Sequence, residues 1–204
     1  MFFLLHTGYN LGVSIGGSTT NLYIKKIEEY KFINESDNDD RTSNANHAYF
    51  KIHGGYQFNA MNNLDIKIEG YVGHDFGTLD SQEKSMFKPS SFFGVIGKGE
   101  LDFYETYCLY FGLGLYCSYS HILKQTGNSE RYLLPTMTWV AGGAYYLNDR
   151  ISICGEFSCI GFGWGYRQLD KIKGITGEKT VYPHGWRIGV GINIHSEKLP
   201  FSKK

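Results

Sequence analysis

Hydrophobic and polar residues alternate strictly along eight segments of the chain, and an alternation with a period of two predicts β-strands. In the clearest segment, "YCLYFGLGLYCSY" (107–119), large apolar side chains occupy alternate positions, with glycine, tyrosine, cysteine and serine between most of them. Segment 138–147 carries small and aromatic residues on both faces, so its inward face is not assigned. The eight segments are 9–16, 50–58, 64–72, 93–101, 107–116, 138–147, 151–158 and 186–194. Two chemically different faces on each strand are typical of an antiparallel, all-β fold.

The connectors between these segments alternate between short and long. The short connector 147–150 contains Asn148 and Asp149, a pair that is typical of a tight turn. The long connectors are polar and cover 25–46, 77–90, 120–135 and 166–184. Short turns at one end with long loops at the other are typical of a transmembrane β-barrel. We therefore expect one domain over 1–204, an eight-stranded antiparallel transmembrane barrel with short periplasmic turns and four long extracellular loops.

Composition supports two different strand faces and excludes one class of partner. The 204 residues include 26 Gly, 16 Tyr and 14 Phe, which is rich in aromatic residues for a chain with 20% charged residues. The formal net charge is zero, so the chain lacks the basic surface that nucleic acid requires. We expect no nucleic-acid partner. No run of 18 apolar residues occurs, so no transmembrane helix is predicted.

The polar strand faces carry charged residues near the strand centres, and this decides which way the faces point. A soluble barrel turns its apolar face inward, whereas a membrane barrel turns it to lipid and fills the lumen with polar groups. Acids and bases are nearly balanced here, so they can pair across a lumen. The lumenal charge network is predicted to comprise Lys51, Lys67, Glu69, Lys98, Glu100, Glu156 and Arg187. Eight strands leave an interior that side chains can fill, so we expect a plugged barrel, with a narrow porin-like channel as the alternative.

Aromatic residues near the ends of the apolar faces fit the two girdles of a membrane barrel. They would lie where the bilayer meets water, against outer-membrane lipid or lipopolysaccharide. The predicted interfacial aromatics are Tyr9, Tyr56, Phe58, Phe76, Tyr107, Tyr119 and Trp186.

Catalytic, cofactor and metal sites are not expected. The seven histidines lack the spacing of metal ligands, and the four cysteines form no CxxC pair, so free thiols are favoured over two disulfides. Ser120-His121 and His74-Asp75 lie at predicted rims, where a lipid-modifying barrel enzyme would need them. Strand parity turns Ser118 and Ser120 inward and His121 outward, which separates a nucleophile from its base.

The whole pattern resembles the small eight-stranded outer-membrane barrels of Gram-negative bacteria, the opacity-protein and outer-membrane-protein-A type. The resemblance covers about 6–195 and is carried by "YYLNDRISICGEF" (145–157), a tight hairpin, and "GWRIGVGINIH" (185–195), a closing strand. It implies a non-enzymatic surface protein of the bacterial outer membrane, without a cofactor, whose loops serve adhesion, host or environmental interaction, or envelope integrity. The chain departs from the family by continuing as "SEKLPFSKK" instead of ending on an aromatic residue, and 1–6 are too short for a signal peptide. A soluble lipocalin-like carrier and a lipid-modifying enzyme are the remaining alternatives.

Overall fold

The computed structural model describes residues 7–26, 45–61, 64–76, 87–103, 106–123, 129–162, 166–168 and 179–196, and these residues form β-strands joined by turns. The strands are β1 (Thr7–Lys26), β2 (Ala45–Met61), β3 (Leu64–Phe76), β4 (Phe87–Phe103), β5 (Tyr107–Leu123), β6 (Ser129–Asn148), β7 (Ile151–Phe162), β8 (Tyr166–Gln168) and β9 (Lys179–His195). All pairings are antiparallel. Within the described residues, no helix is long and apolar enough to cross a membrane.

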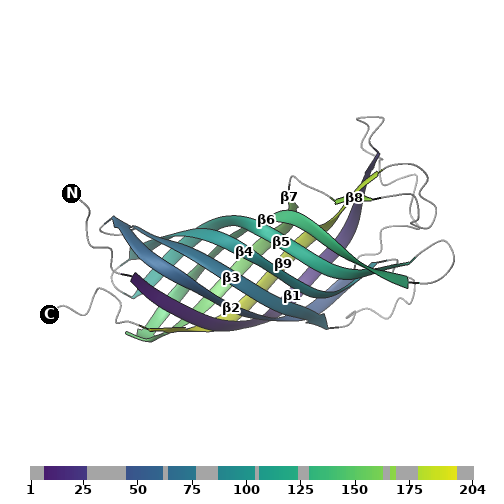
Figure 1. Cartoon of the computed structure of the whole chain (residues 1–204). Coiled ribbons are helices and arrows are strands. Elements are labelled where there is room, and N and C mark those ends of the chain that lie inside the picture. The colour runs from purple at the N-terminus through teal and green to yellow at the C-terminus, as the bar shows by residue number, and fades with distance from the viewer. Residues whose placement is uncertain are drawn as a thin grey trace.

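The eight long strands close into a barrel (Figure 1). Each strand from β1 to β6 pairs with the strand that follows it, and β7 pairs with β9. The barrel closes because β9 also pairs with β1, from Asn10↔His195 to Lys26↔Lys179. Beyond the ladder, the Tyr9 N–H donates to Ser196 Oγ and the Ser196 N–H donates to Tyr9 O, both at 2.9 Å. The predicted closed, eight-stranded antiparallel fold is confirmed, and the short β8 adds only to the outer part of β9.

One end of the barrel carries the start of β1, the end of β9 and the tight turns, and we call it the turn end. At the turn between β6 and β7, Asn148 Oδ1 accepts hydrogen bonds from the Arg150 N–H at 2.9 Å and the Ile151 N–H at 3.0 Å. An asparagine side chain that closes a turn in this way holds the hairpin without glycine. The opposite end, which we call the loop end, carries β8 and the far ends of β1, β5, β6 and β9 (Figure 1).

The predicted loop boundaries are wrong, because the strands run further at the loop end than the alternation indicates. Residues 120–123 and 129–135 belong to β5 and β6, 87–90 belong to β4, and 179–184 belong to β9. Residues 25–26 and 45–46 likewise lie in β1 and β2, and 166–168 form β8. Beyond the bilayer both strand faces meet water, so a ladder continues without an apolar face to mark it. The rest of the four predicted loops lies outside the described residues.

Three prolines lie at the loop end where a strand lacks one neighbour. Pro89 of β4 lies beyond the last pair with β3, His74↔Ser91, and Pro135 of β6 lies before the first pair with β7. Pro183 of β9 lies between the residues that pair with β7 and those that pair with β8. A residue without an N–H group is tolerated where one side of the ladder has no partner strand.

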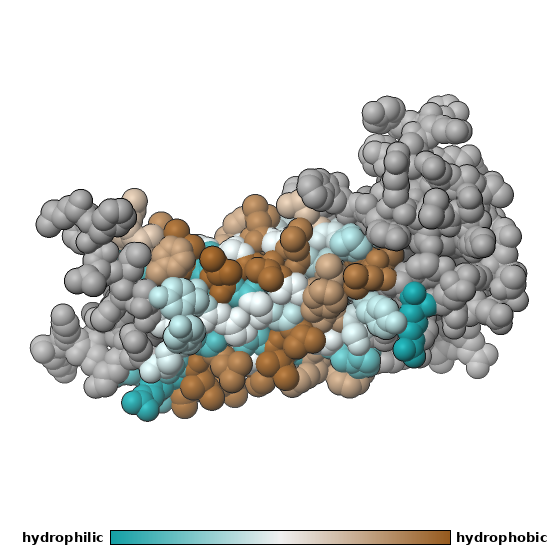
Figure 2. Space-filling view, in the orientation of Figure 1, coloured by the Kyte–Doolittle hydropathy of each residue, from teal (hydrophilic) through white to brown (hydrophobic). Residues whose placement is uncertain are grey.

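The outward face of the barrel is apolar along every long strand. Leu11, Leu115 and Val190 are examples, each about 60% exposed, and Figure 2 shows apolar side chains spread over the body of the barrel. The inward face holds the buried polar and charged residues. A lipocalin-like carrier needs Leu109, Leu113, Val190 and Ile192 inside, but all four are exposed, so that alternative is wrong. An apolar wall around a charged interior places the barrel in a lipid bilayer.

The inward face of β6, which the sequence left open, is now assigned. Its buried residues include Leu134, Thr136, Thr138, Val140 and Ala144. The lumen therefore combines an uncharged lining on this strand with charged linings on β2, β3 and β4.

Candidate functional site: the charged lumen

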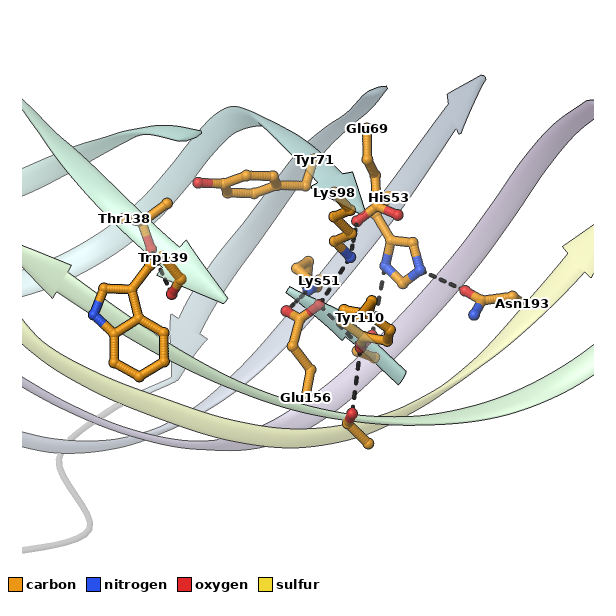
Figure 3. Close-up of polar contacts among 12 residues, drawn as sticks. Lys51, His53, Glu69, Tyr71, Lys98, Tyr110, Thr138, Trp139, Glu156 and Asn193 are labelled. Carbon is orange, nitrogen blue, oxygen red and sulfur yellow. Dashed lines mark hydrogen bonds and ion pairs between the residues drawn. The ribbon is translucent and has the colours of Figure 1, made fainter. Parts of the chain in front are cut away.

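Six charged side chains form an alternating chain of ion pairs inside the barrel, which we call the ionic chain. Lys98 lies in the middle, with Nζ 2.9 Å from Glu69 Oε1 and 3.0 Å from Glu156 Oε2. Figure 3 shows Lys51 and Lys98 converging on Glu156. In order along the chain, the members are Lys51, Glu156, Lys98, Glu69, Lys67 and Glu100. Three lysines balance three glutamates, so the buried cluster carries no net formal charge.

Strand register explains why Glu69 is central to the ionic chain. Lys67 of β3 and Lys98 of β4 are directly opposite each other, an arrangement that is unfavourable for two like charges. Glu69 lies on the same inward face of β3, where Oε1 accepts a hydrogen bond from Lys98 at 2.9 Å and Oε2 forms an ion pair with Lys67 at 3.0 Å. Its side chain is 1% exposed, so the carboxylate has exchanged water for these two partners.

Glycine makes room for one of these lysines. A Cβ atom at Gly112, on the inward face of β5, would lie 2.9 Å from Lys98 Cγ and 2.7 Å from Gly97 O. The stem of Lys98 therefore occupies the volume that any other residue at Gly112 would fill. Tyr110 contacts the same lysine, with its ring centroid 4.6 Å from Lys98 Nζ, and its hydroxyl lies 3.4 Å from Glu156 Oε2.

Arg187 lies apart from the ionic chain, in a second group that we call the arginine cluster. Arg187 Nη2 donates to Asp75 Oδ2 at 2.8 Å and to the Tyr116 hydroxyl at 2.9 Å. The guanidinium carbon lies 3.6 Å from the centroid of the Phe92 ring and 5.4 Å from that of Tyr49. The cluster, which comprises Arg187, Asp75, Tyr116, Phe92 and Tyr49, thus holds one cation with one carboxylate and three rings.

Asp75 is the partner that the sequence reasoning missed. The predicted strand 64–72 ends before Asp75, and the sequence places Asp75 beside His74 at a predicted rim. Extending the parity of β3 from Glu69 to 71, 73 and 75 turns Asp75 inward, and it is 3% exposed. Its second oxygen accepts from Ser18 Oγ at 3.4 Å.

A third group, the histidine chain, links β1, β2, β9 and β7 near the turn end. His53 Nδ1 lies 3.5 Å from Ser14 Oγ, and His53 Nε2 lies 2.6 Å from Asn193 Oδ1 (Figure 3). Asn193 Nδ2 donates to Ser152 Oγ at 3.4 Å, and Ser152 Oγ lies 3.0 Å from His195 Nε2. All five side chains are buried, and they contact one another without a charged partner in these contacts. The group therefore links the strands on both sides of the β1–β9 pairing that closes the barrel.

Little free volume remains between these groups. A cavity of about 10 Å³ lies between the histidine chain and the ionic chain, and one of about 20 Å³ lies between the ionic chain and the arginine cluster. A cavity needs at least about 10–15 Å³ to hold one water molecule. Within the described part of the lumen, each of these two cavities therefore has room for about one water.

The predicted interfacial aromatics lie on the outward face near the two ends of the wall. Tyr9, Tyr56, Phe58 and Tyr107 lie towards the turn end, and all but the half-buried Phe58 are exposed. Phe76, Tyr119 and Trp186 lie towards the loop end and are exposed. Tyr9 and Tyr56 pack edge to face, with ring centroids 5.1 Å apart. Two tiers of aromatic side chains with an apolar wall between them are the arrangement typical of a membrane barrel.

The chain has the architecture of a small outer-membrane β-barrel. A closed antiparallel barrel with a polar lumen, an apolar wall and short turns at one end is the architecture of outer-membrane proteins. Short turns face the periplasm in this class, so the turn end is the periplasmic end and the loop end faces outward.

The residues considered for catalysis are not assembled into a triad in the described part of the structure. His74 lies on the outward face, where Nδ1 is 3.1 Å from Ser91 Oγ, whereas Asp75 points into the lumen. Ser118 is buried, and the side chains of Ser120 and His121 lie outside those described. Among the described residues, no group of three His, Cys, Asp or Glu side chains could hold a metal ion.

Comparisons with known proteins agree with the fold and go no further. No family model and no curated protein matches the chain. Neisserial surface protein A is 9% identical with a TM-score of 0.48, and the alignment covers 90% of this chain and 96% of that one. The attachment invasion locus protein Ail of Yersinia pestis is 16% identical with a TM-score of 0.47, covering 90% and 97%. The outer membrane protease OmpT of Escherichia coli is 11% identical with a TM-score of 0.37, covering 92% and 96%. Such identities and TM-scores carry no argument about activity or partners.

Proposed function

We propose that this protein is a plugged outer-membrane barrel that displays its surface segments to host or environmental partners, in adhesion or in support of the envelope. The segments are those between the observed strand ends at the loop end, 27–44, 77–86, 124–128 and 169–178. The observation that carries the proposal is the filling of the described part of the lumen, where the two cavities beside the ionic chain each have room for about one water molecule. A barrel that transports nothing through its interior acts through its surfaces.

The paired charges oppose ion conduction. A permeating ion would have to separate buried partners such as Lys98 and Glu69, and each separated charge would be left without water or a counter-ion. Breaking a buried pair costs about 3–5 kcal/mol, so several pairs in series are a high barrier. A narrow channel stays the alternative function that the first experiment excludes or supports.

The strand lengths favour display. At the loop end β5 and β6 stay paired as far as Leu123↔Ser129, beyond the interfacial Tyr119, and β1 and β9 stay paired as far as Lys26↔Lys179 (Figure 1). Paired strands that project past the bilayer start and end the intervening segments above the lipid. We propose a non-catalytic role, because the outward His74 and the lumenal Asp75 cannot act on one substrate.

Planar bilayer recording tests the plugged lumen. We expect the full chain to show no stepwise conductance, and a Glu69→Ala/Lys98→Ala variant to open measurable steps because it empties the middle of the ionic chain. Stepwise conductance of the unmodified protein would instead favour the channel.

Binding by whole cells tests display. Cells that carry the protein should bind a host-cell or matrix-coated surface more than cells that carry a variant whose residues 27–44 and 169–178 are replaced by short Gly-Ser links. Heat-modifiable gel migration should be the same for both, which controls for barrel folding. Equal binding by the two strains would reject display by these segments.

A further inference from the structure

The histidine chain lies at the turn end of the lumen. Its last member, His195, ends β9 and pairs with Asn10 near the start of β1. Behind the chain lies the cavity of about 10 Å³, whose lining includes both histidines together with Lys67 and Glu69 of the ionic chain. His53 and His195 are 4% and 8% exposed. The histidine chain therefore stands between the periplasmic mouth of the lumen and the buried ion pairs.

The hydrogen bonds of the histidine chain run in one direction, which the amide of Asn193 sets. Its Oδ1 can only accept, so His53 Nε2, 2.6 Å away, is the donor (Figure 3). Its Nδ2 donates to Ser152 Oγ at 3.4 Å. The hydroxyl of Ser152 keeps its own proton for His195 Nε2 at 3.0 Å, and that nitrogen accepts only while His195 is neutral. The chain is therefore complete with a neutral imidazole at its periplasmic end.

A proton on His195 would reverse the last of these hydrogen bonds. The imidazolium Nε2 and the hydroxyl of Ser152 would then both be donors, so the hydroxyl proton would need another acceptor. Ser152 is 0% exposed, and its partners in the described lumen are Asn193, which already donates, and His195. A buried donor without an acceptor and a buried charge without a counter-ion are both costly. The closed chain therefore excludes the protonated form of His195.

The groups around His195 do not supply a counter-ion. β7 contributes Ser152, and β1 contributes the uncharged Asn10. β6 contributes Tyr146, with its ring centroid 5.8 Å from that of His195. The charged groups that line the cavity behind His195 are Lys67, Glu69, Lys98, Glu100 and Glu156. The other titratable groups that line it are His53, Cys108, Tyr110, Tyr146 and Cys154. Each of the three glutamates is already paired with a lysine, so among the described residues a charge on His195 would have no carboxylate in contact.

We propose that the histidine chain is an acid-sensitive seal at the turn end of the lumen. It is closed while His195 is neutral, and proton uptake by His195 separates it from Ser152 and admits water from the periplasmic side to the cavity behind. Histidine changes charge between about pH 5 and 8, whereas carboxylates in water take up protons near pH 4. The ionic chain therefore stays paired in this range, and the opening is confined to the turn end. The inference concerns the lumen alone and does not depend on the display role proposed above.

Two thiols behind the histidine chain can report its opening. Cys108 and Cys154 are buried and line the cavity, whereas Cys117 and Cys159 are half-buried on the outward face. The test measures, by peptide mass mapping, how fast methylmercury labels each cysteine of the purified full chain in uncharged detergent micelles between about pH 7.5 and about pH 5. Methylmercury is the probe because it binds thiols in acid as well, and the outward pair gives the reference rate at each pH.

We expect the lumenal thiols to be labelled faster in acid, relative to the outward thiols. Because a histidine released into water has a pKa of about 6.5, each pH unit below that value should raise the open population and the relative rate about tenfold. The rate should return to its neutral value when the pH is restored. Heat-modifiable gel migration should stay the same throughout, which separates local opening from unfolding of the barrel.

Two variants test the sensor in opposite ways. In His195→Gln, the side-chain oxygen accepts from Ser152 but takes up no proton, so the rise in acid should be lost. In Asn193→Asp, the new carboxylate accepts the proton of Ser152, whose oxygen can then accept from a protonated His195. This variant keeps the histidine and should stay closed in acid, so it tests the same step if His195→Gln fails to fold.

The matched control is His74→Gln, which removes an outward histidine that also contacts a serine, Ser91 at 3.1 Å. Its labelling profile should be that of the unmodified chain. Equal loss of the rise in this control would overturn the proposal, as would a flat profile of the unmodified chain down to about pH 5. A rise that begins only near pH 4 would also overturn it, because the carboxylates would then be the sensor.

Discussion

The ionic chain and the arginine cluster lie in one lumen but keep their charges buried in different ways. In the ionic chain, Glu69, Lys98, Lys67 and Glu156 each have two partners of opposite charge. In the arginine cluster, Arg187 has one carboxylate partner, Asp75, and is otherwise surrounded by aromatic rings. The ionic chain is therefore redundant, and the arginine cluster depends on a single pair.

This difference determines how much each charge matters. Removing one partner from a buried pair leaves an uncompensated charge, which is more costly than the pair is worth. A redundant chain limits that cost, because the remaining partner shifts towards the charge left behind. The arginine cluster has no second carboxylate among the described residues to do so, and rings provide only part of the attraction.

The largest effect is expected from Asp75→Asn. Asparagine keeps the shape but removes the one carboxylate among the described residues that pairs with Arg187, so unfolding from lipid vesicles in denaturant should require about 3–5 kcal/mol less. Adding Arg187→Met should restore most of this loss, because no unpaired charge then remains. If Asp75→Asn unfolds like the unmodified protein, the rings alone hold Arg187 and the comparison fails.

A smaller effect is expected from Glu69→Gln, although Glu69 is equally buried. Its two lysines each keep another carboxylate, Glu156 for Lys98 and Glu100 for Lys67, so the loss should be about 2 kcal/mol. The same change at Glu100, which ends the chain with one contact of 3.7 Å, should cost less than 1 kcal/mol. The same vesicle assay measures both losses. A larger loss of unfolding free energy for Glu69→Gln than for Asp75→Asn would contradict the redundancy of the ionic chain.

Period-two alternation was sufficient to predict the barrel and which strand faces carry charge. Lys51, Lys67, Glu69 and Lys98 alternate with lipid-facing residues, so their burial follows from parity. The division of the lumen could not be predicted in this way, because it depends on register. Glu69 and Asp75 both lie on β3, and Arg187 lies on β9, three strands away. The register between these strands decides which carboxylate meets Arg187, and parity contains no information on register.

The strand ends were mispredicted for a related reason. Alternation reports two chemically different strand faces, whereas Ser129 and Lys179 lie in paired strands where the sequence shows no such alternation. The register shift between Pro89 and Ser91 is equally invisible to a pattern that assumes unbroken parity, so it could be found only from the pairing of β4 with β5.

Gly112→Ala tests whether the ionic chain is packed as tightly as its partners imply. The new methyl group would meet Lys98 Cγ and Gly97 O at less than 3.0 Å, so we expect a loss of about 2 kcal/mol. Gly97→Ala is the matched control, since a Cβ there faces lipid and lies 3.9 Å from its nearest neighbour, Leu113 O. Equal stability of the two variants would show that the lysine stem moves aside without cost.

The smallest effect is expected from Tyr116→Phe, which separates the ring from the hydroxyl in the arginine cluster. Arg187 Nη2 loses the hydrogen bond to the hydroxyl at 2.9 Å but keeps Asp75 at 2.8 Å and the ring 4.9 Å away. One hydrogen bond contributes about 1 kcal/mol, so the free energy of unfolding should fall by about that amount. Tyr145→Phe, which removes a hydroxyl from the exposed outer wall, should leave it unchanged. In the Asp75→Asn background the cost of Tyr116→Phe should rise, because Arg187 then has only neutral acceptors among the described residues and each of them matters more. Simple additivity of the two changes would show that the cluster does not act as a unit.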